Sequence, residues 1–258
     1  MPRLSPLDSL PVCEKRKLLY WALVEHYRQW ICYDGIVFEQ IREENKLSRK
    51  NLRQIARRYE VGRGITGATD KQKKNGQDPH ADWLASELNS ISQGWPDTLK
   101  ARAEKCAEIA ECAKTNGHSK YLPASAITKL IWFIQPDGWT MFDNLAALGL
   151  RSRNTGNSVI RMKAFYKELA ERKFSNHACS LNRTIQNTDF SDLYGERIID
   201  KFLMILGASV EWRENLIQEN EIFLSLIPES LKNNIHKLAK DISDCHADSL
   251  LKKEPESS

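Results

Sequence analysis

Apolar residues recur at helical spacing along most of the chain, and no stretch of useful length alternates apolar and polar residues as a half-buried strand does. The pattern predicts helices over residues 13–32, 36–45, 48–59, 78–92, 96–115, 159–172, 196–206, 211–219 and 228–242. Ser48 is a preferred N-cap residue and Pro96 suits the first turn of a helix. The pair Asp34-Gly35 is expected to end the first helix. The fold class is therefore predicted to be all-α, a compact fold of many helices.

The most apolar stretch, residues 121–150, is expected to lie at the centre of this fold. Small residues from Ala124 onward follow a proline and precede an apolar run, so a helix should begin there. Proline blocks helix continuation and glycine accepts turn geometry, so residues 136–138 (Pro-Asp-Gly) should end it. Lys129 then stands alone as a charged residue within an apolar helix.

A second short helix is expected directly after this turn. Asp143 is a preferred N-cap residue and Gly149 is a good residue for the position after a helix. The two helices together would bury Leu130, Trp132, Phe133, Leu145 and Leu148. Asp143 would stand at the start of the second helix, either only as a cap or also as a functional carboxylate.

The ends of the chain differ in composition from its middle. Residues 1–11 contain three prolines and should form an extended lead-in, and residues 245–258 are expected to be a disordered tail. Residues 12–244 are expected to fold as one helical domain, or as two helical lobes at 12–117 and 118–244.

Composition narrows the class of protein. The 258 residues are 41% hydrophobic and 28% charged, which is typical of a soluble globular chain. No apolar run reaches the roughly 18–20 residues of a membrane span, and no signal peptide is recognisable, so we expect a cytoplasmic monomer without a membrane partner. The six cysteines are scattered without a CxxC pair, so reduced thiols and neither metal nor cofactor are expected.

Residues 46–74 are the most basic part of the chain, and residues 62–76 combine glycines with lysines. A loop of this kind can approach phosphates closely and supply positive charge. Candidate DNA-binding residues here are Arg63, Lys71, Lys73 and Lys74, and a later polar loop adds Arg151 and Arg153. A flexible solvated loop is an equally good interpretation. The net charge of +4 is compatible with a polyanionic partner but does not require one.

The central stretch resembles the core signature of the helix-hairpin-helix DNA glycosylases. In that family a Leu-Pro-Gly-x-Gly hairpin leads to a catalytic lysine, an apolar helix and a proline-containing turn follow, and an aspartate after an apolar residue is catalytic. Here Leu122-Pro123 leads to Lys129, and Phe142-Asp143 follows the turn. Ala124, Ser125 and Ala126 replace the hairpin glycines. The spacing from lysine to aspartate is roughly one helical turn shorter than is usual in the family, which keeps both on the same helix face.

Two weaker resemblances extend this one. Residues 195–207 resemble the closing helix of bacterial proteins similar to 8-oxoguanine glycosylase. The whole chain resembles bacterial anti-phage glycosylases that remove glucosylated hydroxymethylcytosine from phage DNA. The resemblance implies a central helix-hairpin-helix-like element and double-stranded DNA with a modified base as the partner.

The resemblance also implies a role for each residue of the element. Asp143 would stabilise the positive charge that develops on the sugar as the base leaves, and Lys129 would either attack C1′ or position DNA. The backbone N–H groups of Ala124, Ser125 and Ala126 would bind a phosphate at the helix N-terminus. Candidates for stacking on the flipped base are Tyr121, Trp132, Trp139 and Phe142, for each of which core packing is the alternative.

Other functions remain open at this stage. A non-catalytic helical DNA-binding protein would use the same hairpin and the same basic segment. A repair glycosylase for oxidised purines would share the chemistry but differ in the base that it removes. A helical interaction protein would have no salt-dependent affinity for DNA, so a binding assay across a salt series separates it from the others.

Overall fold

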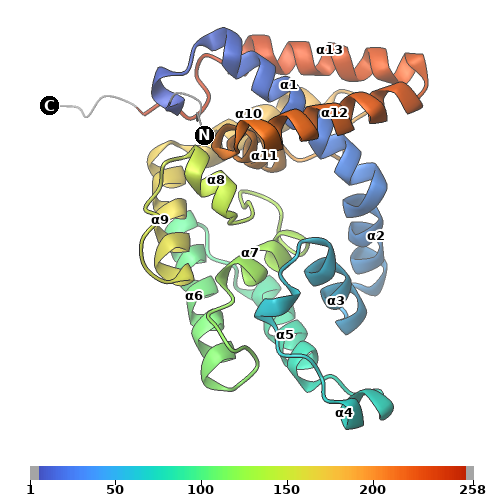
Figure 1. The fold of residues 1–258 in the computed structure, drawn as a ribbon, viewed down its shortest axis with the longest axis vertical. Coiled ribbons are helices and arrows are strands. Elements are labelled where there is room, and N and C mark those ends of the chain that lie inside the picture. Colours follow the sequence, from blue (N-terminus) through green and yellow to red (C-terminus); the bar gives the residue numbers. More distant parts are fainter. Residues whose placement is uncertain (1–5, 254–258) are drawn as a thin grey trace, which may run out of the picture. The chain divides into compact units, whose positions relative to one another are not determined.

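The computed structural model describes residues 6–253 apart from the Ser92 side chain, and its elements are all helices, with no strand in this range (Figure 1). The all-α prediction is confirmed. The α-helices are α1 (Val12–Gln29), α2 (Gly35–Glu44), α3 (Arg49–Arg58), α4 (Asp70–Lys74), α5 (Pro79–Ser90), α6 (Leu99–Thr115), α7 (Ala124–Trp132), α8 (Asn144–Gly149), α9 (Ser158–Glu171), α10 (Phe174–Gln186), α11 (Gly195–Gly207), α12 (Val210–Leu226) and α13 (Glu229–His246). Short 3-10 turns are η1 (Leu7–Ser9), η3 (Gly62–Gly64) and η4 (Ile91–Gln93), and η2 (Trp30–Asp34) is a π-helical turn.

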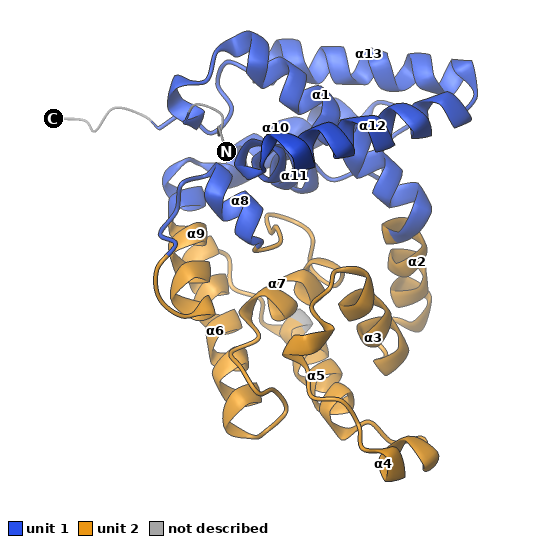
Figure 2. Cartoon of the chain, viewed as in Figure 1, with its two compact units in different colours: residues 1–33, 143–154, 168–258 blue, residues 34–142, 155–167 orange. Residues whose placement is uncertain are grey.

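The chain divides into two units, each with its own core (Figure 2). Unit 1 comprises residues 1–33, 143–154 and 168–258, and unit 2 comprises residues 34–142 and 155–167. The boundary between lobes considered at residues 117 and 118 lies inside unit 2. Unit 1 is therefore built from both ends of the chain together with a short middle segment.

In unit 1, α11 is the central helix and is buried along nearly its whole length. It packs against α1, α8 and α10, because its apolar residues recur on more than one face. Ile198, Phe202 and Leu203 are fully buried. This burial is what makes α11 the core of unit 1.

The contact between α8 and α11 brings two backbones together. A Cβ added at Gly207 would overlap the carbonyl oxygen of Leu145, and one added at Gly149 would overlap the carbonyl oxygen of Leu203. Gly149 is therefore required for close packing of the two helices. The residue that adopts the left-handed conformation after α8 is instead Arg151, with φ of 53°. Our expectation that Gly149 would supply the turn after the helix was wrong.

The core of unit 2 is rich in aromatic residues. The ring of Trp139 stacks on Tyr166 at a centroid distance of 4.1 Å, and Trp132 meets Phe38 edge-on at 4.9 Å. The Tyr166 hydroxyl donates to the carbonyl oxygen of Thr140 at 2.7 Å, so its polar end is satisfied inside the core. These contacts join α2, α7 and α9 with the segment that follows α7.

Several helix ends differ from the predictions. The chain stays helical at Asp34, because α1 continues through the π-helical turn η2 into α2. Thr98 caps α6, so Pro96 lies before the helix. Residues 70–74 form α4, because the Thr69 hydroxyl accepts from the Gln72 N–H while the Gln72 side chain accepts from the Thr69 N–H.

Parts of both chain ends pack within unit 1. Leu7 is buried, and the Asp8 carboxylate binds Arg172 at 2.7 Å. Leu250 and Leu251 are fully buried, and Arg172 also donates to the carbonyl oxygen of Leu251 at 2.7 Å. Residues 245–253 are therefore not a disordered tail, because two leucines cover apolar surface there. Residues 1–5 and 254–258 of the expected lead-in and tail lie outside the described range.

The contact between α8 and α11 predicts a large effect of one methyl group. Gly207→Ala should lower the free energy of unfolding by about 1–3 kcal/mol, the usual cost of overpacking, because neither neighbouring backbone is a flexible group that can move aside. Gly67→Ala is the matched control, since a Cβ there meets nothing within 4 Å. Thermal and urea unfolding measure both. Equal stability of the two variants would contradict the close backbone contact.

Candidate active site and nucleic-acid interface

Lys129 lies on α7, which begins at Ala124 as predicted. Its side chain is only 7% exposed, and its Nζ lies 5.8 Å from the centre of the Tyr59 ring, over the ring face. A buried ammonium group needs a compensating partner, and an aromatic face within about 6 Å is one. Lys129 is therefore not an ordinary surface lysine.

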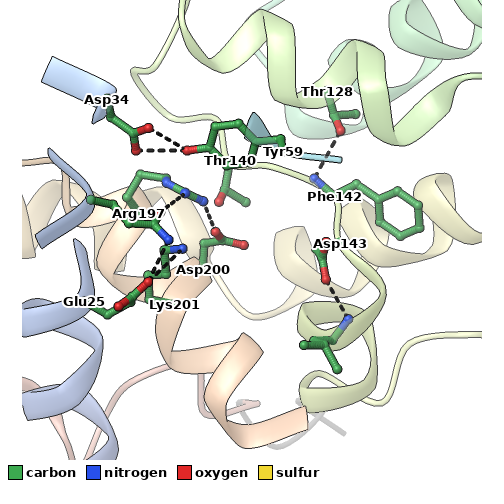
Figure 3. Close-up of polar contacts among 12 residues, drawn as sticks. Glu25, Asp34, Tyr59, Thr128, Thr140, Phe142, Asp143, Arg197, Asp200 and Lys201 are labelled. Atoms are coloured by element: carbon green, nitrogen blue, oxygen red, sulfur yellow. Dashed lines mark hydrogen bonds and ion pairs between the residues drawn. The ribbon is translucent and has the colours of Figure 1, made fainter. Parts of the chain in front are cut away.

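α7 also fixes the segment that leads to Asp143. The Thr128 hydroxyl accepts from the Phe142 N–H at 3.2 Å (Figure 3). The Ser125 hydroxyl donates to the Phe142 carbonyl oxygen at 3.1 Å. The Trp139 indole N–H donates to the Thr128 carbonyl oxygen at 3.2 Å. Both backbone groups of Phe142 are thus bound to α7, which holds the chain one residue before Asp143.

Asp143 is the N-cap of α8, as predicted. Its backbone is extended and its Oδ1 accepts from the Leu145 N–H at 2.9 Å (Figure 3). The side chain is half-buried. Asp143 begins the middle segment of unit 1, whereas Lys129 belongs to unit 2. The cap fixes the carboxylate at a helix N-terminus, where partial positive charge stabilises an anion.

The four aromatic candidates for base stacking have different environments. Trp132 and Trp139 are fully buried and Phe142 is 2% exposed, all within the core of unit 2. Tyr121 is 70% exposed, and both of its backbone polar groups are bound by the hydroxyl of Ser119. Of these four, Tyr121 presents its ring to solvent on a firmly held backbone.

The start of α7 lies against the glycine-rich segment. Ala124 and Ala126 are buried, Ser125 is half-buried, and no side chain caps the helix. A Cβ added at Gly64 would lie 3.4 Å from Pro123, so the turn η3 approaches the N-terminus of α7 closely. This approach brings the segment that carries the exposed Arg63 to the start of α7.

The basic segment forms one wall of a cleft of about 570 Å³. Its lining residues are Arg49, Arg53, Ala56, Arg57, Gly62, Gly67, Ala68, Lys73, Gly76, Gln77 and Asp78. Four of these side chains are basic and one is acidic. The lining therefore carries a positive charge that suits a phosphate.

Two arginines of this cleft are held by acidic residues of α5 and its cap. Arg49 binds Asp82 at 2.6 Å, and Arg53 binds Asp78 at 2.8 Å and also donates to the Thr66 carbonyl oxygen at 2.9 Å. Burial acts to raise the pKa of Asp78, but hydrogen bonds from Arg53 and the Ala81 N–H and the nearby positive charges lower it overall. These pairs support the cleft wall, while Arg57 has no ion-pair partner among the described residues.

The remaining DNA-binding candidates are on the surface. Lys71, Lys73 and Lys74 belong to α4, where no residue is buried, and Lys73 alone of these three lines the cleft. Arg151 and Arg153 are exposed in the loop after α8, in unit 1. The structure thus brings Lys73 to the cleft and Arg63 to the start of α7, and leaves Arg151 and Arg153 in the other unit.

Sequence reasoning did not identify the buried charges that join α1 to α11 in unit 1. Glu25 accepts from Arg28 at 2.8 Å and from Gln29 at 2.6 Å. Its carboxylate lies 3.9 Å from the Lys201 Nζ (Figure 3). Arg197 binds Asp200 on the same helix. The sequence signal for such a cluster is a set of charged residues on the apolar face of a helix, which α11 carries.

His26 belongs to the same buried region. Burial lowers its pKa well below the ordinary value, and the charges of Arg197 and Lys201 act in the same direction. The neutral ring then accepts the Tyr194 N–H through Nε2 at 3.1 Å. A charged histidine here would be buried beside the positive charges of Arg197 and Lys201 and would destabilise unit 1.

Within residues 6–253, no three histidine, cysteine, aspartate or glutamate side chains gather closely enough to hold a metal ion. None of the described helices combines the length and the apolar character that crossing a membrane requires. No protein-family model, curated protein or solved structure was found to match this chain.

Proposed function

We propose that the chain is a DNA N-glycosylase that flips out and excises a modified base and leaves an abasic site. The observation that carries the proposal is the fixed carboxylate of Asp143, which caps α8 directly after a segment that α7 holds by both backbone groups of Phe142. The resemblance of residues 121–150 to the glycosylase core gives this carboxylate its proposed role. The buried Lys129, which α7 carries in unit 2, belongs to the same resembling stretch and supports the proposal.

The chemistry breaks the bond between C1′ of the sugar and the nitrogen of the base. The base leaves with the bonding electrons and takes up a proton, and the oxygen of a water molecule, or the Lys129 amine in the alternative mechanism, bonds to C1′. Positive charge develops on the sugar before that bond forms. A carboxylate that is already fixed in place stabilises this charge without having to reorganise.

DNA binding by unit 2 is part of the proposal. Arg57 and Lys73 line the basic cleft, and Arg63 stands beside the start of α7. Positive side chains around a glycine-lined cleft suit the sugar–phosphate backbone, whose recognition does not depend on sequence. The proposed partner is double-stranded DNA, bound by a monomer in the cytoplasm.

The proposed substrate is hypermodified phage DNA that contains glucosylated hydroxymethylcytosine, which would make the protein a defence enzyme. This choice rests on the resemblance of the whole chain to anti-phage glycosylases. Incubation with normal and hypermodified phage DNA, followed by alkali, tests it, because alkali cleaves DNA at abasic sites. Cleavage of oxidised-purine DNA instead would identify a repair glycosylase.

A non-catalytic DNA-binding protein is the second candidate. The basic cleft favours it as much as the first, because phosphate binding there requires neither Asp143 nor Lys129. The two candidates differ only in whether a base is released.

The exposed lysines of α4, one of which lines the cleft, are predicted to contribute to DNA affinity. Replacement of Lys71, Lys73 and Lys74 by alanine should weaken binding to an unmodified duplex and lower the salt dependence of log K by about 0.9 for each phosphate that is no longer neutralised. None of the three side chains is buried, so the fold should be retained. Fluorescence anisotropy across a salt series measures both quantities.

The matched control replaces three exposed lysines of α6, Lys100, Lys105 and Lys114, by alanine. It removes the same charge from the same unit but leaves the cleft intact. If both triple variants bind DNA equally weakly, the effect is one of net charge, and the cleft has no special role.

The proposed role of the Asp143 carboxylate predicts how a conservative substitution changes the excision rate. Asp143→Asn keeps the side-chain oxygen that accepts from Leu145, so the fold should survive, while excision should fall by about 10²–10³-fold, the usual effect of removing one electrostatic interaction with a transition state. Release of free base and alkali-labile sites are the measurements. Asp137→Asn, an exposed carboxylate in the turn after α7, is the control and should excise normally.

Full excision by a folded Asp143→Asn protein would remove the basis of the proposal. No excision by the unaltered protein on any modified DNA, together with salt-dependent binding, would favour the non-catalytic DNA-binding protein.

A further inference from the structure

Asp34 is a buried carboxylate that has no part in the proposed chemistry. It is 1% exposed, ends the π-helical turn η2 and precedes α2, but its side chain does not cap that helix. The Tyr59 hydroxyl lies 2.8 Å from its Oδ1 and 2.9 Å from its Oδ2 and donates to this carboxylate (Figure 3). π-helical turns are rare and often occur at functional sites.

Three contacts fix the ring of Tyr59. Its hydroxyl is bound to Asp34, its ring meets Phe133 at a centroid distance of 5.9 Å and an angle of 71°, and its face carries the Nζ of Lys129 at 5.8 Å. All four residues belong to unit 2. A ring held in this way presents a fixed face to the lysine.

The face of an aromatic ring attracts a cation electrostatically, and it attracts a neutral amine much less. A phenol that donates its proton to a carboxylate carries more electron density in its ring, so this attraction is stronger than for an isolated tyrosine. A lysine side chain otherwise has large rotamer freedom, which a fixed partner reduces. The arrangement thus holds the Nζ of Lys129 over the face of a fixed ring.

We propose that Tyr59, held by Asp34, positions the Lys129 ammonium, and that Lys129 acts as a fixed cation for a DNA phosphate and not as an amine nucleophile. Tyr59 and Asp34 are then positioning residues that act through Lys129. This inference rests on the proposed glycosylase function. It decides between the two mechanisms that the chemistry alone leaves open.

Two substitutions at Lys129 separate the mechanisms. Lys129→Arg keeps the positive charge and can stack on Tyr59 but cannot form a Schiff base, so excision should stay within about 10-fold of the unaltered enzyme. Lys129→Gln removes the charge and should excise much more slowly. Borohydride should trap no covalent complex between protein and DNA. A trapped adduct that Lys129→Arg abolishes, with loss of excision, would overturn the proposal.

Substitutions at Tyr59 test whether it acts through Lys129. Tyr59→Leu should slow excision by about 3–30-fold, the range expected from a cation–π contact. Tyr59→Phe keeps the ring but loses the hydrogen bond to Asp34, so its rate should fall between those of Tyr59→Leu and the unaltered enzyme. In a protein that already carries Lys129→Gln, Tyr59→Leu should have no further effect on the rate. Phe165→Leu, which loosens the aromatic core of unit 2 at Tyr166, should show no such coupling.

A final measurement does not require excision. The ε-methylene protons of Lys129 lie near the Tyr59 ring face, so their NMR signal should be shifted upfield by the ring current in the free protein. The shift should be smaller in Tyr59→Phe, whose ring is no longer bound to Asp34, and should vanish in Tyr59→Leu. An unshifted signal in the unaltered protein overturns the positioning role. A shifted signal without excision on any DNA instead contradicts the glycosylase function and leaves the positioning of Lys129 standing. Normal excision by Tyr59→Leu overturns the inference alone.

Discussion

The direct contact between the backbones of α8 and α11 is the constraint on which unit 1 depends. Helices usually meet through side chains at about 8–10 Å between axes, but Gly149 and Gly207 remove the side chains at the crossing. Because α11 is the buried centre of unit 1, its contact with α8 fixes the position of α8 within that unit. Asp143 is the N-cap of α8. The position of its carboxylate therefore depends on Gly149 and Gly207, which lie at the C-terminal ends of α8 and α11.

Much of the fold was predictable because the signals were local. Ser48 and Asp143 were identified as N-caps, and each accepts a backbone hydrogen bond in the structure. The start of α7 at Ala124 follows from the sequence beside it. The capping box of Thr69 and Gln72 that begins α4 was an equally local signal. The glycines and lysines around it, however, favoured the prediction of a loop.

What was not predictable depends on partners that are distant in sequence. Arg53 looked like one more positive charge of the basic segment, yet its carboxylate partner, Asp78, lies 25 positions later. The helix does not end at Asp34 as expected, and the Asp34 side chain binds Tyr59 at the C-terminal end of α3. The proposed roles of Lys129 and Asp143 come from resemblance, and the structure adds their surroundings within each unit, not their function.

α4 has a consequence for how the basic surface behaves. None of its residues is buried, and the hydrogen bonds of its capping box link Thr69 with Gln72 inside the same turn. Unfolding α4 locally should therefore cost little free energy compared with unfolding a core helix. Trypsin should therefore cut the native protein first in this lysine-rich turn, before any core helix. The same exposure lets the lysine side chains of α4 move without disturbing the rest of unit 2, which would suit the proposed contact with a phosphate backbone.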